Sequence, residues 1–309
     1  MLKQWTDEKI KRYKKFAVTA SLLVSSTLFL IKTFAVFTTG SLAILSSLAD
    51  SLSDIVASLV SFFAVRISSK PISCTHRYGY FKAEHLSALF QAAFIAGSGI
   101  FVLYGGIDRF LNPVVLKNTR VGIAVMIISL GLTICLVMFQ NYVAENTRSI
   151  AVKADSGHYM VDLLSNGGII VSLVIVQFCK VYWFDTLTAF CIAVYLIFYA
   201  YRLAREAVDF LMDKELPEDI RQKVFHIITT IDGVKGVHDL RTRDLGNAYY
   251  FEVHIEMDGA LSLSQAHDIC DVAEHKIKEV YPQAQILIHQ DPYGIKEDRL
   301  DDALESCLF

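Results

Sequence analysis

The sequence of 309 residues lacks the large charge imbalance that marks proteins with nucleic-acid partners. Its 29 Lys and Arg nearly balance 32 Asp and Glu, and the net charge is −3, so no nucleic-acid partner is expected. The six cysteines include no Cys-x-x-Cys pair, which argues against a disulfide framework and a cysteine-based zinc site. No His-Glu-x-x-His motif and no Walker phosphate loop occurs. A membrane metallohydrolase and direct ATP drive are therefore unsupported.

Charged residues are also absent from two long apolar runs, at 85–107 and 121–144. Each run reaches the ~20 residues that a helix needs to cross a bilayer. A mean hydropathy of +0.41, with charge collected at the two ends, excludes an ordinary soluble enzyme and a disordered chain. Shorter apolar runs become full spans if some charged residues are accepted inside the membrane. We predict six membrane helices, near residues 14–36, 42–67, 84–108, 120–141, 150–178 and 183–202.

Basic residues beside these helices indicate the orientation of the chain. They cluster before the first predicted helix, after the second and after the last, whereas the first outside loop, around Thr38–Ser41, carries no charge. The positive-inside rule therefore places both termini in the cytoplasm. The connection after the third helix carries Arg109, Lys117 and Arg120. This assignment places it outside the cytoplasm, where the rule disfavours basic residues. The first apolar run is longer than the core of a signal peptide, so we treat it as a membrane helix.

The C-terminal third has a different pattern. Two helical segments, beginning at Pro217 and Leu263, alternate with strand patterns at Val234–Arg243, Ala248–Met257 and Gln285–His289. The order αββαβ is typical of a small two-layer α+β domain. We therefore divide the chain into a membrane α-helical domain at 1–210, a cytoplasmic metal-binding domain at 211–293 and an acidic tail at 294–309 that we expect to be disordered.

Two pairs of ionisable residues interrupt the predicted membrane helices. Asp50 and Asp54 lie four residues apart in the second helix, and His158 and Asp162 lie four apart in the fifth. Each pair shares one helix face, so two facing helices would bring three carboxylates and an imidazole together. A charge at the bilayer centre costs at least ~2.5–3.5 kcal/mol on insertion scales. Neither helix carries Lys or Arg at that depth, and a divalent cation would supply the compensation.

Three oxygens and one imidazole favour tetrahedral zinc. Calcium and magnesium prefer more oxygen ligands or water, and copper(I) prefers sulfur, whereas iron, cadmium and manganese stay open. Metal binding requires deprotonated ligands, so protons and metal compete. We predict zinc efflux by proton antiport with alternating access. Hydrogen bonding inside the bundle, a passive channel and a metal-gated sensor are the alternatives. Asp155 lies one turn before His158 and could share its face, but it is nearer the cytoplasmic end, so we assign it as a helix-end or entry residue.

Five motifs together carry a family resemblance over about residues 12–293. They are Asp50-x-x-x-Asp54, His158-x-x-x-Asp162, Gly79–Glu84, His238–Arg243 and His289–Pro292. The chain resembles the cation diffusion facilitator family, in particular its bacterial ferrous-iron-efflux-type zinc/proton antiporters. The resemblance implies a homodimer in the bacterial inner membrane, with a six-helix bundle and a metallochaperone-like cytoplasmic domain in each protomer. It also implies that the two pairs form the transport site.

The resemblance implies further sites. A binuclear zinc site at the dimer interface matches His238, His254, His267, His289 and Asp291. Zinc there would bridge protomers and, as a hypothesis, couple the cytoplasmic zinc level to bundle geometry.

An ion pair between the two domains matches Lys82 and Asp213. The family's loop site matches Ser73, His76 and Tyr80, where only the histidine is a ligand type, so we expect that site to be absent or very weak.

Overall fold

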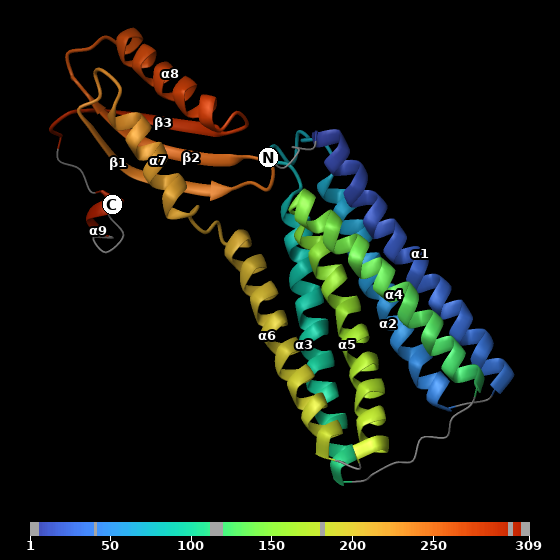
Figure 1. The fold of residues 1–309 in the computed structure, drawn as a ribbon. Helices are drawn as coiled ribbons and strands as arrows, with labels where there is room; N and C mark the ends of the chain where they lie inside the picture. Colours follow the sequence, from blue (N-terminus) through green and yellow to red (C-terminus); the bar gives the residue numbers. More distant parts are fainter. Residues whose placement is uncertain (1–5, 40–41, 112–119, 180–182, 296–298, 304–309) are drawn as a thin grey trace. The chain divides into compact units, whose positions relative to one another are not determined.

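The computed structural model describes residues 6–39, 42–111, 120–179, 183–295 and 299–303 (Figure 1). In parts of the membrane helices, including Asp50, it describes the backbone alone. The chain divides into two compact units, Met1–Val208 and Asp209–Phe309.

The N-terminal unit is a bundle of long helices (Figure 1). The described residues form six of them: α1 (Asp7–Thr39), α2 (Leu42–Ser68), α3 (Lys82–Leu111), α4 (Arg120–Thr147), α5 (Ile150–Cys179) and α6 (Trp183–Leu211). All except α5 contain a described segment that is long and apolar enough to cross a membrane. In α5 the side chains are described for residues 150–164 and 167 alone, a stretch too short to be assessed in the same way. Six long helices thus lie where we predicted them, and the prediction of a membrane domain with five or more apolar helices is confirmed.

Small residues allow the helices of this bundle to approach closely. Ala88 and Ala92 of α3 pack with Ala154 of α5 and Ala200 of α6 in one buried cluster. Close approach of this kind is how helices associate in lipid, where burial of apolar surface provides no driving force between them. Large apolar side chains instead lie on the outside, as for Phe37, which is 86% exposed.

The C-terminal unit contains one three-stranded sheet in the order β1-β2-β3. Its described elements are α7 (Glu218–Thr229), β1 (Gly236–Asp244), β2 (Tyr249–Met257), α8 (Leu263–Val280), β3 (Gln285–Pro292) and α9 (Leu300–Ala303). Strands β1 and β2 are antiparallel. Strands β2 and β3 are parallel, so the chain must cross over between them, and α8 makes that crossover.

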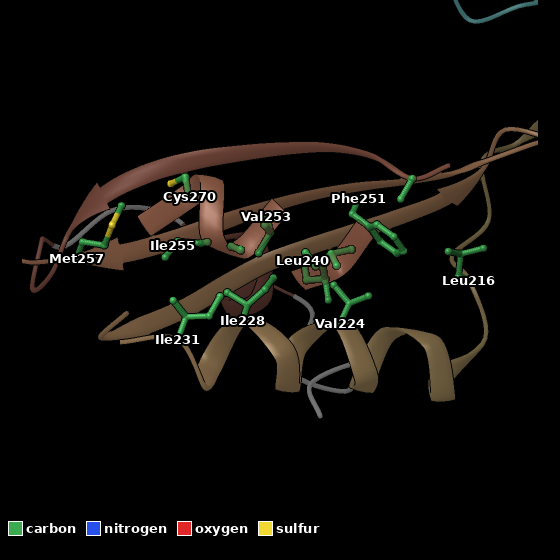
Figure 2. Close-up of a cluster of buried hydrophobic side chains, with 13 residues drawn as sticks. Leu216, Val224, Ile228, Ile231, Leu240, Phe251, Val253, Ile255, Met257 and Cys270 are labelled. Atoms are coloured by element: carbon green, nitrogen blue, oxygen red, sulfur yellow. The ribbon is translucent and has the colours of Figure 1, made fainter. Parts of the chain in front are cut away.

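A hydrophobic core covers one face of this sheet (Figure 2). Phe251, Val253 and Ile255 of β2 are fully buried in it. Val224 and Ile228 of α7 pack against them, together with residues of α8. Because side chains alternate across a strand, the residues between the buried ones, such as His254, lie on the opposite face. The polar face of the sheet is therefore free of both helices.

Part of the predicted tail is ordered against the sheet. Asp239 carboxylate oxygens accept hydrogen bonds from the backbone N–H of Leu300 at 3.1 Å and of Asp301 at 3.0 Å. The Asp239 N–H in turn donates to Asp301 Oδ2 at 2.8 Å. These hydrogen bonds place residues 300 and 301 beside β1, and the disorder that we expect of 294–309 as a whole stays a prediction.

Candidate metal-binding sites

Helices α2 and α5 bring one member of each predicted pair into contact. His158 Nε2 lies 3.1 Å from Asp54 Oδ1. Both residues are buried, at 5% and 6% exposure. The other imidazole nitrogen, Nδ1, has no hydrogen-bond partner among the described residues. The predicted facing of the two helices thus holds for this pair.

The other two predicted ligands are less fully described. Asp162 is half-buried one turn beyond His158, close enough to act electrostatically on its imidazole. Asp50 lies one turn before Asp54 in α2, and its side chain is outside the described residues. The assembly of all four ligands stays a prediction.

A lysine of α1 approaches the same region. Lys32 Nζ donates a hydrogen bond of 2.6 Å to Ser51 Oγ, and Ser51 directly follows Asp50 in α2. Our charge argument counted cations only within the second and fifth helices and therefore missed this residue. Its signal in the sequence was a single Lys that interrupts the first apolar run. Part of the charge compensation at this depth thus comes from the protein.

The polar face of the sheet gathers a second set of ligands. His238 pairs with His254 across β1 and β2, and His254 pairs with His289 across β2 and β3. His254 Nδ1 lies 2.8 Å from Asp291 Oδ2, and His238 Nε2 lies 3.6 Å from it. Among the described residues, His238, His254 and Asp291 form the group of three whose ligand atoms lie close enough to share one metal ion.

Two further residues border this group. His289 Nε2 lies 3.2 Å from Asp291 Oδ1, on a side chain that is 65% exposed. Glu256, which we did not predict, has Oε1 3.3 Å from His238 Nδ1. Its signal was its position on the same strand face as His254, two residues on. A carboxylate on the second nitrogen of a metal-binding imidazole fixes the ring and raises its basicity.

The residue after His238 is held by the tail. Asp239 has a positive φ of 52° at the irregular pairing between His238 and Arg241. Burial raises the pKa of the Asp239 carboxyl, but hydrogen bonds from the backbone of Asp301 and Leu300 outweigh it and leave the pKa below its usual value. The charged carboxylate therefore stabilises the backbone turn beside His238.

Two predictions remain, the metal ligand His267 and the Lys82–Asp213 ion pair. His267 lies on α8, across the sheet from the cluster, and its Nε2 is 3.5 Å from Asp271. Within one chain it does not join the metal ligands. Asp213 accepts a hydrogen bond of 3.4 Å from Arg243, whereas Lys82 belongs to the other unit, so the Lys82–Asp213 ion pair stays a prediction.

In the loop between α2 and α3, the three residues of the predicted weak site contact one another. The hydroxyl oxygens of Ser73 and Tyr80 lie 2.9 Å apart. His76 stacks on the Tyr80 ring at 4.4 Å, and its Nδ1 is 3.0 Å from Thr75 Oγ1. A serine, a stacked histidine and a tyrosine are a poor ligand set for zinc.

Comparison with known proteins assigns both units. Residues 18–212 match the model of the cation efflux transmembrane domain. Residues 216–293 match that of the cation efflux protein, cytoplasmic domain. The chain belongs to the cation diffusion facilitator family. It is therefore an integral membrane protein of the cation-efflux type and not an enzyme.

Close relatives extend over nearly the whole chain. The cation-efflux pump FieF of Serratia proteamaculans is 42% identical over 287 residues, 92% of this chain and 94% of that protein. The pump of the same name from Yersinia pestis is 39% identical over 292 residues, 94% of this chain and 96% of the relative. The metal-bound C-terminal domain of the CzcD transporter from Thermotoga maritima is 26% identical, with a TM-score of 0.25, over 26% of this chain and 93% of that one.

Proposed function

We propose that the protein exports divalent metal cations, with zinc as the main substrate, in exchange for protons. The observation that carries the proposal is the 3.1 Å contact between Asp54 and His158, which joins two membrane helices at buried positions. Oxygen and imidazole ligands suit zinc. The family assignment supports efflux, and the relatives' printed name, cation-efflux pump, agrees with it.

Proton coupling follows from the same groups. A carboxylate and an imidazole bind zinc only when deprotonated, so each zinc ion must displace protons. If the bundle opens alternately to each side, one site exchanges zinc for protons across the membrane. Iron, cadmium or manganese as the main substrate is the alternative, since these ions accept similar ligands.

The assembly that we propose is a homodimer in the bacterial inner membrane, with both termini in the cytoplasm. The basic residues around the first, second and last helices support this orientation. The match to the cytoplasmic domain supports pairing through the C-terminal units. In such a dimer, zinc held by His238, His254 and Asp291 would link the protomers.

Transport in vesicles tests the proposal. Purified protein with a proton gradient should accumulate zinc to saturation, and dissipating the gradient should stop accumulation. Asp54→Ala should abolish it, while Asp271→Ala, an exposed change on α8, should not. Undiminished zinc uptake by Asp54→Ala would refute the site, and flux proportional to driving force without saturation would indicate a channel.

The imidazole tests the choice of metal. His158→Asp replaces the nitrogen ligand by oxygen and should shift preference from zinc towards manganese, which favours carboxylates. Vesicle uptake with both metals in competition measures the shift. An unchanged zinc-to-manganese ratio would show that His158 does not set selectivity.

A regulatory role for the C-terminal cluster is the second candidate. It is favoured by the cross-strand alignment of three histidines around Asp291. The double variant His254→Ala, Asp291→Ala should retain transport at high zinc and lose its dependence on cytoplasmic zinc. An unchanged dependence would leave the cluster with a structural role only.

A further inference from the structure

Asp155 is a fully buried carboxylate that the proposed transport site does not use. Its side chain has 0% exposure, and Gln140 Nε2 of α4 donates a hydrogen bond of 2.5 Å to Oδ2. The other carboxylate oxygen, Oδ1, has no hydrogen-bond partner among the described residues, and no described Lys or Arg contacts the group. The hydroxyls of Ser21 and Ser61 and the imidazole of His158 stabilise the charged carboxylate in part, and a bound cation would add to that stabilisation.

The surroundings of Asp155 supply hydroxyl donors and also acceptor oxygens that have no partner among the described residues. Hydroxyl groups of Ser21 and Ser61 face the carboxylate, and Gln91 Nε2 of α3 donates to Ser61 Oγ. Gln91 and Gln140 are both 0% exposed, and the amide oxygen of each has no hydrogen-bond partner among the described residues. Five helices, α1 to α5, thus contribute oxygens to this buried region. Three of those oxygens, on Asp155, Gln91 and Gln140, have no hydrogen-bond partner among the described residues.

The cluster lies between the transport site and the cytoplasmic end of the bundle. Lys153 Nζ donates to Glu206 Oε2 at 2.6 Å, so the start of α5 lies beside the end of α6. Helix α6 ends at Leu211, where the chain continues into the cytoplasmic domain. Asp155 lies three residues, about 4.5 Å along the axis, nearer to that end than His158.

We propose that Asp155, Gln140, Gln91 and Ser61 form a second cation site, a staging position that receives a divalent cation before His158 and Asp54 bind it. The proposal rests on the proposed transport function. If the side-chain amide of Gln140 rotates by half a turn, its oxygen takes the position that its NH2 group held. The same side chain therefore donates to the bare carboxylate when the site is empty and coordinates a cation when it is filled.

The ligand set makes this site weak, as a staging position requires. One carboxylate balances only half the charge of a divalent cation, and amide and hydroxyl oxygens are hard, neutral ligands. A conducting pathway needs sites that attract the ion yet release it. The transport site, with imidazole and several carboxylates, then competes successfully for the zinc.

Two substitutions in the full-length protein test the proposal with Zn²⁺ alone as the probe. Asp155→Asn keeps the shape and removes the charge, and should raise the KM for zinc about tenfold with little change in kcat. Gln140→Glu adds a second carboxylate. It should bind one more zinc per protomer than wild type in equilibrium dialysis and should slow turnover. Ser156→Ala, which removes a neighbouring part-buried hydrogen bond from Ser156 Oγ to Asn141 Oδ1, is the matched control.

The outcomes separate this proposal from the transport proposal. A wild-type KM in Asp155→Asn, or no additional zinc in Gln140→Glu, would overturn the staging site. If Asp155→Asn fails to fold, the dialysis measurement on Gln140→Glu still decides. If wild-type vesicles move no zinc at all, the proposed transport function fails, whereas the difference in bound zinc between Gln140→Glu and wild type still tests the second site.

Discussion

The two candidate metal sites are built by different means in the two units. In the bundle, Asp54 and His158 come from two helices and are almost fully buried. In the sheet, three histidines align across three strands, and the side chain of His289 is 65% exposed. The first site is isolated from solvent, as the proposed exchange of one ion would require. The second is open on one face, as the proposed contact with a second protomer would require.

The difference also appears in how each site is held. Membrane helices satisfy their own backbone hydrogen bonds, so the α2–α5 contact depends on side chains. The sheet cluster depends on strand register, which the core on its other face stabilises. The variant with the largest expected effect is therefore one that disrupts that core.

Phe251→Ala should disrupt the sheet cluster and leave the bundle site intact. Phe251 is fully buried and packs against Tyr281 with ring centroids 5.7 Å apart. Truncating a buried Phe costs about 3–5 kcal/mol, so hydrogen exchange should show β2 and β3 opening while α2 and α5 stay protected. Thr229→Ala, exposed at the end of α7, is the control. Equal loss of protection in both units would show that the two sites do not fold independently.

Replacing Lys32 in the bundle should have a smaller effect than Phe251→Ala. It should strengthen zinc binding at the bundle site, whereas Phe251→Ala should disrupt the sheet cluster. Lys32→Met takes away a positive charge that hydrogen-bonds to Ser51, near the proposed ligands. A charge pair at 4 Å is worth about 1–4 kcal/mol across the dielectric range of protein surfaces and water. We therefore expect zinc to bind the transport site at least tenfold more tightly and to leave it more slowly.

Isothermal titration and vesicle turnover measure these two effects of Lys32→Met. Lys32→Arg keeps the charge and should behave as wild type in both. Zinc binding that is unchanged or weaker in Lys32→Met would show that the lysine does not compete with the metal. The sheet cluster belongs to the other unit and should keep its affinity in both variants.

Sequence patterns predicted the bundle well because lipid imposes a simple length rule. The Asp54–His158 contact was also predictable, since residues four apart on a helix share a face. Lys32 was missed because the charge argument treated each span alone. Asp155 was assigned as a helix-end or entry residue from its position one turn before His158, and that position alone did not show that its side chain is fully buried.

In the sheet, alternation in β2 showed that His254 and Glu256 lie away from the core. It did not show the alignment of His238 with His289, which depends on cross-strand register and on the positive φ of Asp239. Backbone irregularities of this kind depend on tertiary contacts, here with residues 300 and 301. Composition alone cannot indicate them.

The smallest expected effect concerns a helix end away from both sites. Ser262 caps α8, and its side chain and that of Gln265 each accept from the other's backbone N–H. Ser262→Ala should destabilise the C-terminal unit by about 1 kcal/mol. Ser264→Ala, exposed inside the same turn, should change stability far less. Hydrogen exchange of β2, measured at increasing temperature, should show this loss of stability. Zinc transport should stay unchanged. A loss of transport in Ser262→Ala would mean that bundle function depends on the stability of the sheet.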